Sequence, residues 1–190
     1  MKRNFVWIFL LLAVIAPAAA AQAKQPRTVR DYFMLLPKDY FYPENDYTSS
    51  LTPEQLAQAK KRYLKKYLEV EDNRNGYMQG GGEGLQEKFK LALFKRSGGV
   101  PVVGLNIFGR WGDKFYFLEY RDGKWTNVSE QVAPGYKRSN MYGFTRFSKT
   151  VSVTERKNFD PDDNVGETGE KLYDLVWKND EFGVRNQVKK

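Results

Sequence analysis

The side chains that most enzymes use as bases, nucleophiles and metal ligands are missing from this chain, which has no histidine and no cysteine among its 190 residues. Ser-His-Asp and Cys-His catalysis need an imidazole base, so both are excluded. Structural zinc sites draw on cysteine and histidine, so they are excluded as well. The chemistry that remains is that of carboxylates, lysine and tyrosine, or binding without catalysis.

Paired carboxylates could support glycoside hydrolysis, which needs two acids held about 5–9.5 Å apart across a cleft. Five acids are available in the expected β-structure: Glu69, Glu71, Asp72, Glu83 and Glu119. Nothing in the sequence pairs any two of them, so we assign no catalytic residue. A carboxylate-dependent, glycoside hydrolase-like enzyme is the alternative function. The missing histidine and cysteine and the unpaired acids together favour a protein that is not an enzyme.

Two loops invite a ligand-binding interpretation. Gly80-Gly81-Gly82-Glu83-Gly84 lacks the Gly-Lys-Ser/Thr ending of a phosphate-binding loop, so we expect a flexible connection. The loop from Asp160 to Glu167 is rich in calcium-type oxygen ligands, but Val165 stands where an EF-hand needs glycine. We expect a solvated turn there and assign no metal and no cofactor, and whether the loop binds calcium stays open.

Aromatic side chains are the remaining candidates for a site, and they make up 15% of the chain. Trp111, Trp125, Tyr136 and Tyr142 lie in or beside expected hairpins and could stack on sugars or peptides. Aromatic residues in strands also serve as core, which is the alternative interpretation. If the chain binds a ligand, these four residues are the predicted binding site.

The expected elements are two N-terminal helices followed by strands. Thr28 begins a short helix that Pro37 ends, and Thr52-Pro53 begins a helix over residues 53–68. In the second helix Leu56, Ala59 and Tyr63 form a buried stripe. A solvated face should carry the basic residues, which could also dock on an anionic surface: Lys60, Lys61, Arg62, Lys65 and Lys66.

From Leu68 onward the hydrophobic period changes to two, and turn signals such as Asn75-Gly76 and Asp122-Gly123 separate the strands. This order predicts an α+β domain, with two N-terminal helices packed on a largely antiparallel meander of β-hairpins in one sheet. A small propeller or partial barrel is the second choice.

Two hairpins resemble each other, because residues 112–122 align with residues 169–179. In both, one face carries aromatic, leucine and aromatic side chains, so we expect this face to meet the core or the helices. The opposite face mixes apolar and charged residues, as in Phe115-Phe117-Glu119, and we expect it to be partly wet, that is, partly exposed to solvent. The sequence does not establish whether the match is a duplication.

Residues 1–23 have the layout of a secretory signal peptide. Lys2 and Arg3 precede an apolar run over residues 5–16, which is shorter than the about 20 residues that span a membrane. Ala21-Gln22-Ala23 fits the cleavage pattern, so the mature chain should begin at Lys24, with cleavage after Ala21 as the competitor. We therefore expect a single soluble domain over residues 24–190, in the periplasm or secreted.

Net charge and cysteine content limit the classes of partner and the cell compartment that we expect for this chain. The formal charge of +8 falls to +6 when Lys2 and Arg3 leave with the leader. Export argues against a nucleic-acid partner, so an anionic envelope surface is the more natural partner for a basic domain. A charge of +6 also lies in the ordinary range that simply serves solubility. Without cysteine there is no lipid attachment, so we expect no stable membrane anchor after cleavage. A cysteine-free exported domain suits a bacterial periplasm.

The segment Thr28-Val29-Arg30-Asp31 with the following Tyr32-Phe33-Met34-Leu35-Leu36-Pro37 resembles the start of secreted proteins of Bacteroides-type bacteria. Residues 117–134 are similar to a strand–Gly-Lys-Trp–strand–Pro pattern of bacterial domains of unknown function. This resemblance implies an extracytoplasmic domain and supplies no catalytic residues. Export, the absence of histidine and cysteine, the lack of a convincing metal or nucleotide motif and the aromatic-rich strands make binding of an envelope protein, peptide or glycan the expected function; the oligomeric state and the ligand stay open.

Overall fold

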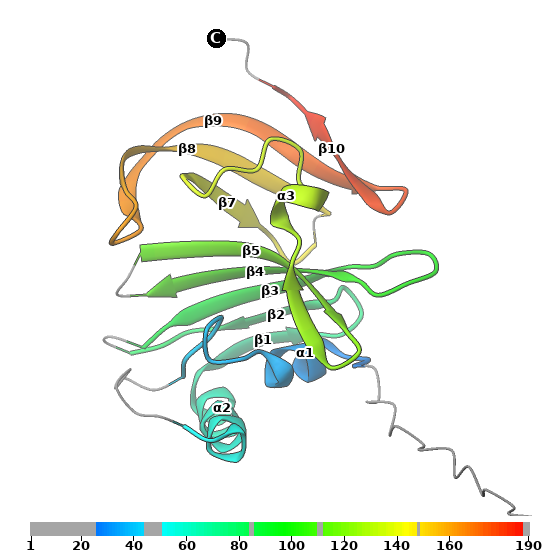
Figure 1. The fold of residues 1–190 in the computed structure, drawn as a ribbon, viewed down its shortest axis with the longest axis vertical. Coiled ribbons are helices and arrows are strands. Elements are labelled where there is room, and N and C mark those ends of the chain that lie inside the picture. The colour runs from blue at the N-terminus through cyan, green and yellow to red at the C-terminus, as the bar shows by residue number, and fades with distance from the viewer. Residues whose placement is uncertain (1–25, 44–50, 84–85, 110–111, 148, 188–190) are drawn as a thin grey trace, which may run out of the picture.

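The computed structural model describes residues 26–43, 51–83, 86–109, 112–147 and 149–187. The predicted leader, its cleavage site and Trp111 lie outside these residues. The chain forms two antiparallel sheets, and Figure 1 shows the second sheet lying over one face of the first, with two helices at the other face. Within the described residues, no helix has the length and apolar character that crossing a membrane requires.

Each sheet follows the order of the chain, as in a series of hairpins. The first has the order β1-β2-β3-β4-β5-β6. Its strands are β1 (Leu68–Asp72), β2 (Tyr77–Gly80), β3 (Lys88–Phe94), β4 (Val102–Gly109), β5 (Gly112–Arg121) and β6 (Lys124–Asn127). The second has the order β10-β9-β8-β7. Its strands are β7 (Asn140–Phe144), β8 (Thr150–Asp160), β9 (Val165–Lys178) and β10 (Glu181–Arg185).

The three described helices are α1 (Val29–Leu35), α2 (Pro53–Tyr67) and the short α3 (Ser129–Val132). Thr28 and Thr52 close capping boxes at the starts of α1 and α2, which satisfy backbone N–H groups that have no partner within the helix. Helix α3 follows β6 and leads toward the second sheet.

The central strands of the first sheet, β3 to β5, are buried on both faces, so their side chains belong to two separate cores. The core on the helix side includes Phe33, Tyr63, Leu91, Leu105 and Leu118. The core between the sheets includes Phe94, Phe117, Phe144, Leu175 and Trp177. Burial on both faces explains why all of residues 102–107 are buried, although side chains alternate between faces along a strand.

The prediction of a mixed but mainly antiparallel fold is confirmed, and its details need four corrections. The strands form two sheets, not one meander, and a third helix follows β6. Strand β7 was not predicted. The face of β5 that was expected to be partly wet is dry at Phe115 and Phe117, which are buried against the second sheet, whereas Glu119 stays partly exposed.

The two hairpins that resemble each other in sequence, β5–β6 and β9–β10, have the same kind of turn. Asp122 and Gly123 join β5 to β6, and Asn179 and Asp180 join β9 to β10, all four with positive φ. Two successive positive φ values fit a two-residue turn whose twist matches that of the strands. The uniform faces are both buried, but on different sides: Tyr120 belongs to the helix-side core and Trp177 to the core between the sheets.

Lys60 departs from its predicted place. It was expected on the solvated face of the second helix, yet its side chain is fully buried. Its ammonium nitrogen donates hydrogen bonds to the carbonyl oxygens of Phe33 (3.1 Å), Met34 (3.2 Å) and Leu36 at the end of α1. The remaining basic residues of α2 that the sequence placed on this face are exposed: Lys61, Arg62, Lys65 and Lys66.

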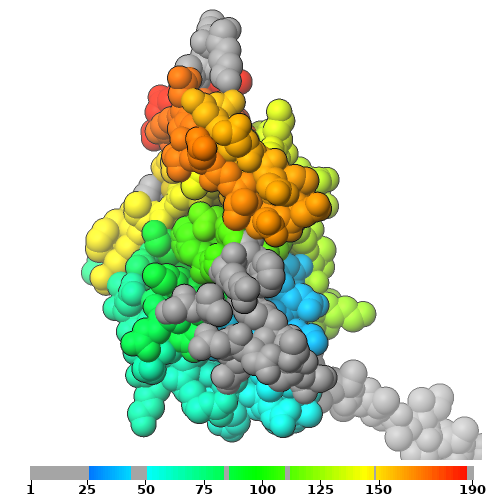
Figure 2. Space-filling model, turned by 90° about the vertical axis from the view of Figure 1, so that its left-hand side faces the viewer, coloured from blue at the N-terminus to red at the C-terminus, as the bar shows by residue number. Residues whose placement is uncertain are grey.

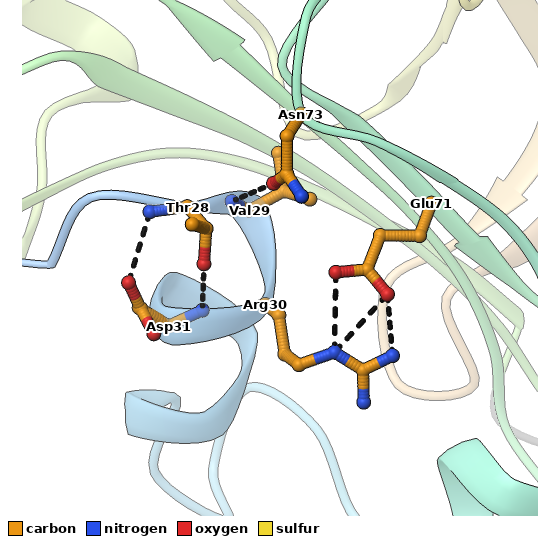
Figure 3. Close-up of polar contacts among 6 residues, drawn as sticks. All are labelled: Thr28, Val29, Arg30, Asp31, Glu71 and Asn73. Atoms are coloured by element: carbon orange, nitrogen blue, oxygen red, sulfur yellow. Dashed lines mark hydrogen bonds and ion pairs between the residues drawn. The ribbon is translucent and has the colours of Figure 1, made fainter.

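Helix α1 is fastened to β1 by polar contacts that Figure 3 shows together. The Val29 N–H donates to the side-chain oxygen of Asn73, which lies in the turn after β1, at 3.3 Å. The Arg30 guanidinium forms a two-point ion pair with Glu71, with Nε 3.1 Å from each carboxylate oxygen. These contacts set the position of α1 along the sheet.

Replacing Glu71 by glutamine should lower the free energy of unfolding by about 0.5–1 kcal/mol at pH 7, the usual range for a partly exposed ion pair. The hydrogen bond from Arg30 lowers the pKa of Glu71 below its ordinary value of 4.5. The ion pair therefore contributes at pH 7, and its contribution is lost as the pH falls below 4.5. Urea unfolding of both proteins at pH 7 and pH 3 measures this; an equal difference at both values would contradict it.

Candidate functional site

Three aromatic rings stack where β5 meets β7. The ring of Phe115 lies 4.7 Å from that of Tyr142, with 22° between their planes. Tyr136, from the segment between α3 and β7, continues the stack at 5.2 Å and 24°. Phe115 and Tyr142 are buried, whereas Tyr136 is half-buried at the outer end. The stack therefore runs from the core to the surface.

Hydrogen bonds hold the two tyrosines in place. The Tyr136 hydroxyl donates to the Phe115 carbonyl oxygen at 3.0 Å. The Tyr142 hydroxyl accepts from the Lys137 N–H at 2.8 Å and lies 3.1 Å from the carbonyl oxygen of the same residue, to which it donates. Burial raises the pKa of both tyrosines above the ordinary value of 10. Both are therefore neutral at physiological pH, and their rings are fixed before any ligand arrives.

A hollow of about 410 Å³ lies against this stack. A second hollow of about 200 Å³ adjoins it and shares Asn127, Glu130 and Tyr136. We call the combined feature the tyrosine groove. Its aromatic wall includes Phe115, Tyr136 and Tyr142 of the stack together with Tyr116, and its polar wall includes Asn127, Glu130, Arg138 and Asn164. Tyr136 borders both hollows and so lies where they adjoin.

The amides of the polar wall are held by the fold. The side-chain oxygen of Asn127 accepts from the N–H (3.0 Å) and hydroxyl (2.7 Å) of Ser129, at the start of α3. Its NH₂ group has no hydrogen-bond partner among the described residues and can serve a ligand. Asn164, 3% exposed, donates its amide to the Asp113 carbonyl oxygen, and Arg156 donates to the Asn164 carbonyl at 2.8 Å.

The four residues predicted to bind a ligand have different surroundings. Tyr136 and Tyr142 lie together in the tyrosine groove. Trp111 is outside the described residues. Trp125 packs against α1: its indole N–H donates to the Leu35 carbonyl oxygen at 2.9 Å, and its ring meets those of Tyr32 and Tyr120. The structure thus brings two of the four together and gives Trp125 a packing role.

Sequence reasoning missed Phe115, Asn127 and Asn164 as groove residues. They come from β5, β6 and the turn between β8 and β9, and no local pattern links these segments. The available signal was the alternation of Asn140, Tyr142 and Phe144, whose side chains are all buried along β7. Reading that alternation as a strand would have placed Tyr142 toward the core and Tyr136 just before it.

The acids considered for a hydrolase are mostly engaged in ion pairs. The pairs are Glu71 with Arg30, Asp72 with Arg146, Glu83 with Lys66, and Glu119 with Arg96. Hydrogen bonds from the cations lower the pKa of Glu71 and Glu83. A general acid needs the opposite, a raised pKa. Glu71 and Glu83 are therefore held as carboxylates.

Two other acids do have a raised pKa, in each case through burial: Glu87 and Asp113. Glu87 accepts the Tyr42 N–H at 2.8 Å, and Asp113 lies in a small hollow of about 40 Å³ with Arg156. Glu87 and Asp113 contact different residues, so we do not assign them as a catalytic pair across a cleft.

The loop considered for calcium is the turn of a hairpin. Strand β8 continues to Asp160 and β9 begins at Val165, so the turn itself is short. The Asp160 carboxylate accepts the N–H groups of Asp162 (2.9 Å) and Asp163 (3.4 Å), as short acidic side chains do in turns. In the part of the chain that the structure describes, no three acids are grouped so as to hold a metal ion.

Comparison of the chain with protein-family models, curated proteins and solved structures gave no significant match. The argument for function therefore depends on the groove and on the chemistry of the residues that line it.

Proposed function

We propose that this protein is an extracytoplasmic binding domain and that its tyrosine groove binds a glycan of the cell envelope. The location follows from the predicted leader, and the site from the groove. The observation that carries the proposal is the position of Tyr136, a half-buried ring at the end of a fixed stack, bordered by two adjoining hollows. Ligand sites commonly combine such an apolar platform with a few well-placed polar groups.

The composition of the groove favours a sugar over a purely apolar ligand. Amides and charged groups from Asn127, Glu130 and Arg138 line the groove together with the aromatic rings. Amide side chains both donate and accept, which matches the hydroxyl groups of a saccharide. Aromatic rings offer a broad apolar face for the C–H side of a pyranose. Two adjoining hollows offer room for more than one linked sugar unit, and an extended peptide is the competing ligand.

Replacing Tyr136 by alanine should weaken glycan binding at least about tenfold, because it removes the outer ring of the stack. The measurement is calorimetric titration with a panel of neutral oligosaccharides that includes chitotetraose, with short peptides as comparison. Tyr136→Phe keeps the ring and loses only the hydroxyl, with its hydrogen bonds to the Phe115 carbonyl oxygen and to Ser129, so most binding should remain.

Phe147→Ala is the matched control, because it removes another exposed aromatic ring that does not line the groove. It should leave oligosaccharide binding unchanged, and thermal unfolding should show that each variant is folded. If no oligosaccharide binds, or if Tyr136→Ala and Phe147→Ala bind equally well, the proposal is wrong. Binding of peptides alone, lost in Tyr136→Ala, would overturn the assignment to a glycan.

A further inference from the structure

A separate hollow of about 230 Å³ opens at the seam between the two sheets. It lies where the β1–β2 hairpin and the end of β3 meet the connection between β7 and β8. In Figure 2 the yellow surface of that connection lies beside the blue-green surface of the hairpin region. The floor is aromatic and consists of Tyr77, Phe94 and Trp177, each 5% exposed or less.

The rim of this hollow is strongly basic. Four exposed cations line it: Arg74, Lys95, Arg146 and Lys149. Arg146 forms an ion pair with Asp72, while the side chains of the other three have no ion pair with any described residue. We call this hollow and its rim the cationic cleft. Four positive charges face one carboxylate, so the cleft attracts anions.

Arg146 is fixed in one orientation. Its Nε donates to Asp72 at 2.6 Å, and Asp72 is itself held by the side-chain amide (2.7 Å) and the N–H (3.1 Å) of Asn75. The guanidinium also lies over the Phe147 ring, 5.0 Å from its centre. Hydrogen bonds from Asn75 and then from Arg146 lower the pKa of Asp72, so this support stays charged. Among the described residues, nothing accepts from the two terminal nitrogens of Arg146.

We propose that the cationic cleft binds an oxyanion, a phosphate or carboxylate group carried on a ring. The terminal nitrogens of Arg146 bind the oxyanion as a fork, which is the geometry that a guanidinium offers to such groups. Arg74, Lys95 and Lys149 add charge from the rim. The aromatic floor and the 78%-exposed Phe147 contact the ring. This inference is independent of the proposed glycan site, because the two features share no lining residue.

The concave shape favours a soluble ligand over an anionic membrane. A membrane-binding surface presents protruding apolar side chains to the acyl region. Here the floor rings are recessed, and Phe147 is the one rim aromatic among the described residues that is exposed.

Titrations with matched probes test the proposal. 4-Nitrophenyl phosphate and 4-nitrobenzoate carry the two oxyanions on the same ring, and 4-nitrophenyl glucoside carries none. At least one of the two anions should bind at least about tenfold more tightly than the glucoside, and more weakly as salt is added. Whichever anion binds more tightly identifies the oxyanion. Equal affinity for the glucoside, or binding to phosphatidylglycerol vesicles without binding of either anion, would overturn the proposal.

Three variants localise the binding. Arg146→Gln should weaken it at least about tenfold, since it removes a charge-assisted pair of hydrogen bonds. It also leaves Asp72 without its partner, so Lys95→Gln, which changes only an exposed rim charge, provides a second test with an expected loss of about threefold. Lys61→Gln changes the same charge on the exposed face of α2 and should have no effect. If Lys61→Gln weakens binding as much as Lys95→Gln, the effect is one of net charge and the site is refuted.

Discussion

Replacing Lys60 by methionine is expected to lower the free energy of unfolding by about 3 kcal/mol, because it removes a charged donor shared by three carbonyl oxygens, of which that of Phe33 keeps the N–H of Leu36. Three carbonyl oxygens at the end of α1 accept from the Lys60 ammonium group, and its side chain is fully buried. Methionine fills similar space but donates no hydrogen bond. Chemical denaturation at pH 7 measures the difference.

The control is Lys61→Met, the same chemical change one residue along α2 on the exposed face. It should change the free energy of unfolding by less than about 0.5 kcal/mol. Burial lowers the pKa of Lys60 to about 7, whereas the three acceptors favour the ammonium, which alone has three N–H donors. Equal stability of the two variants would show that the carbonyl cluster contributes nothing to the fold.

Replacing Gly112 by alanine should lower the free energy of unfolding by about 3 kcal/mol and also weaken ligand binding in the tyrosine groove. Gly112 has a φ of +73° and lies against the turn of the β8–β9 hairpin. A Cβ at this position would overlap the carbonyl oxygen of Asn164, which lines the groove. The second sheet must therefore shift where it contacts the first.

Gly123 gives a matched control, because it also has a positive φ, +79°, but no atom within 4 Å of the added Cβ. Gly123→Ala should therefore cost only the backbone strain, about 1 kcal/mol, and leave binding unchanged. Denaturation and oligosaccharide titration of both variants measure the two effects. If the two variants lose the same stability, the contact between Gly112 and Asn164 does not hold the sheets together.

Local signals in the sequence identified the helices and turns better than they identified the residues against which these elements pack. Thr28 and Thr52 mark helix starts through short-range capping, and Asp122-Gly123 marks a turn through its φ preference. The position of Lys60 depends on a different helix, since its three acceptors lie 24 to 27 residues away. Periodicity predicts which face is polar, but it does not show that a cation on that face covers the end of another helix.

The candidate sites were harder to predict, for the same reason. Tyr136 and Tyr142 were named from composition, but their stacking partner Phe115 was assigned to a partly wet face, because a second sheet over β5 was not expected. The cationic cleft combines residues from the β1–β2 hairpin, β3, β9 and the β7–β8 connection. Such a juxtaposition follows from the packing of the sheets and has no signature in any one segment.

The most direct test of the proposed function is a map of amide chemical-shift changes in the wild-type protein during titration with an oligosaccharide that binds. The account predicts that the largest changes gather at Asn127, Tyr136 and Tyr142, with small changes around Arg146. Changes of similar size spread over the whole surface, or gathered on α2 or the β9–β10 hairpin, would contradict the claim that the tyrosine groove is the binding site.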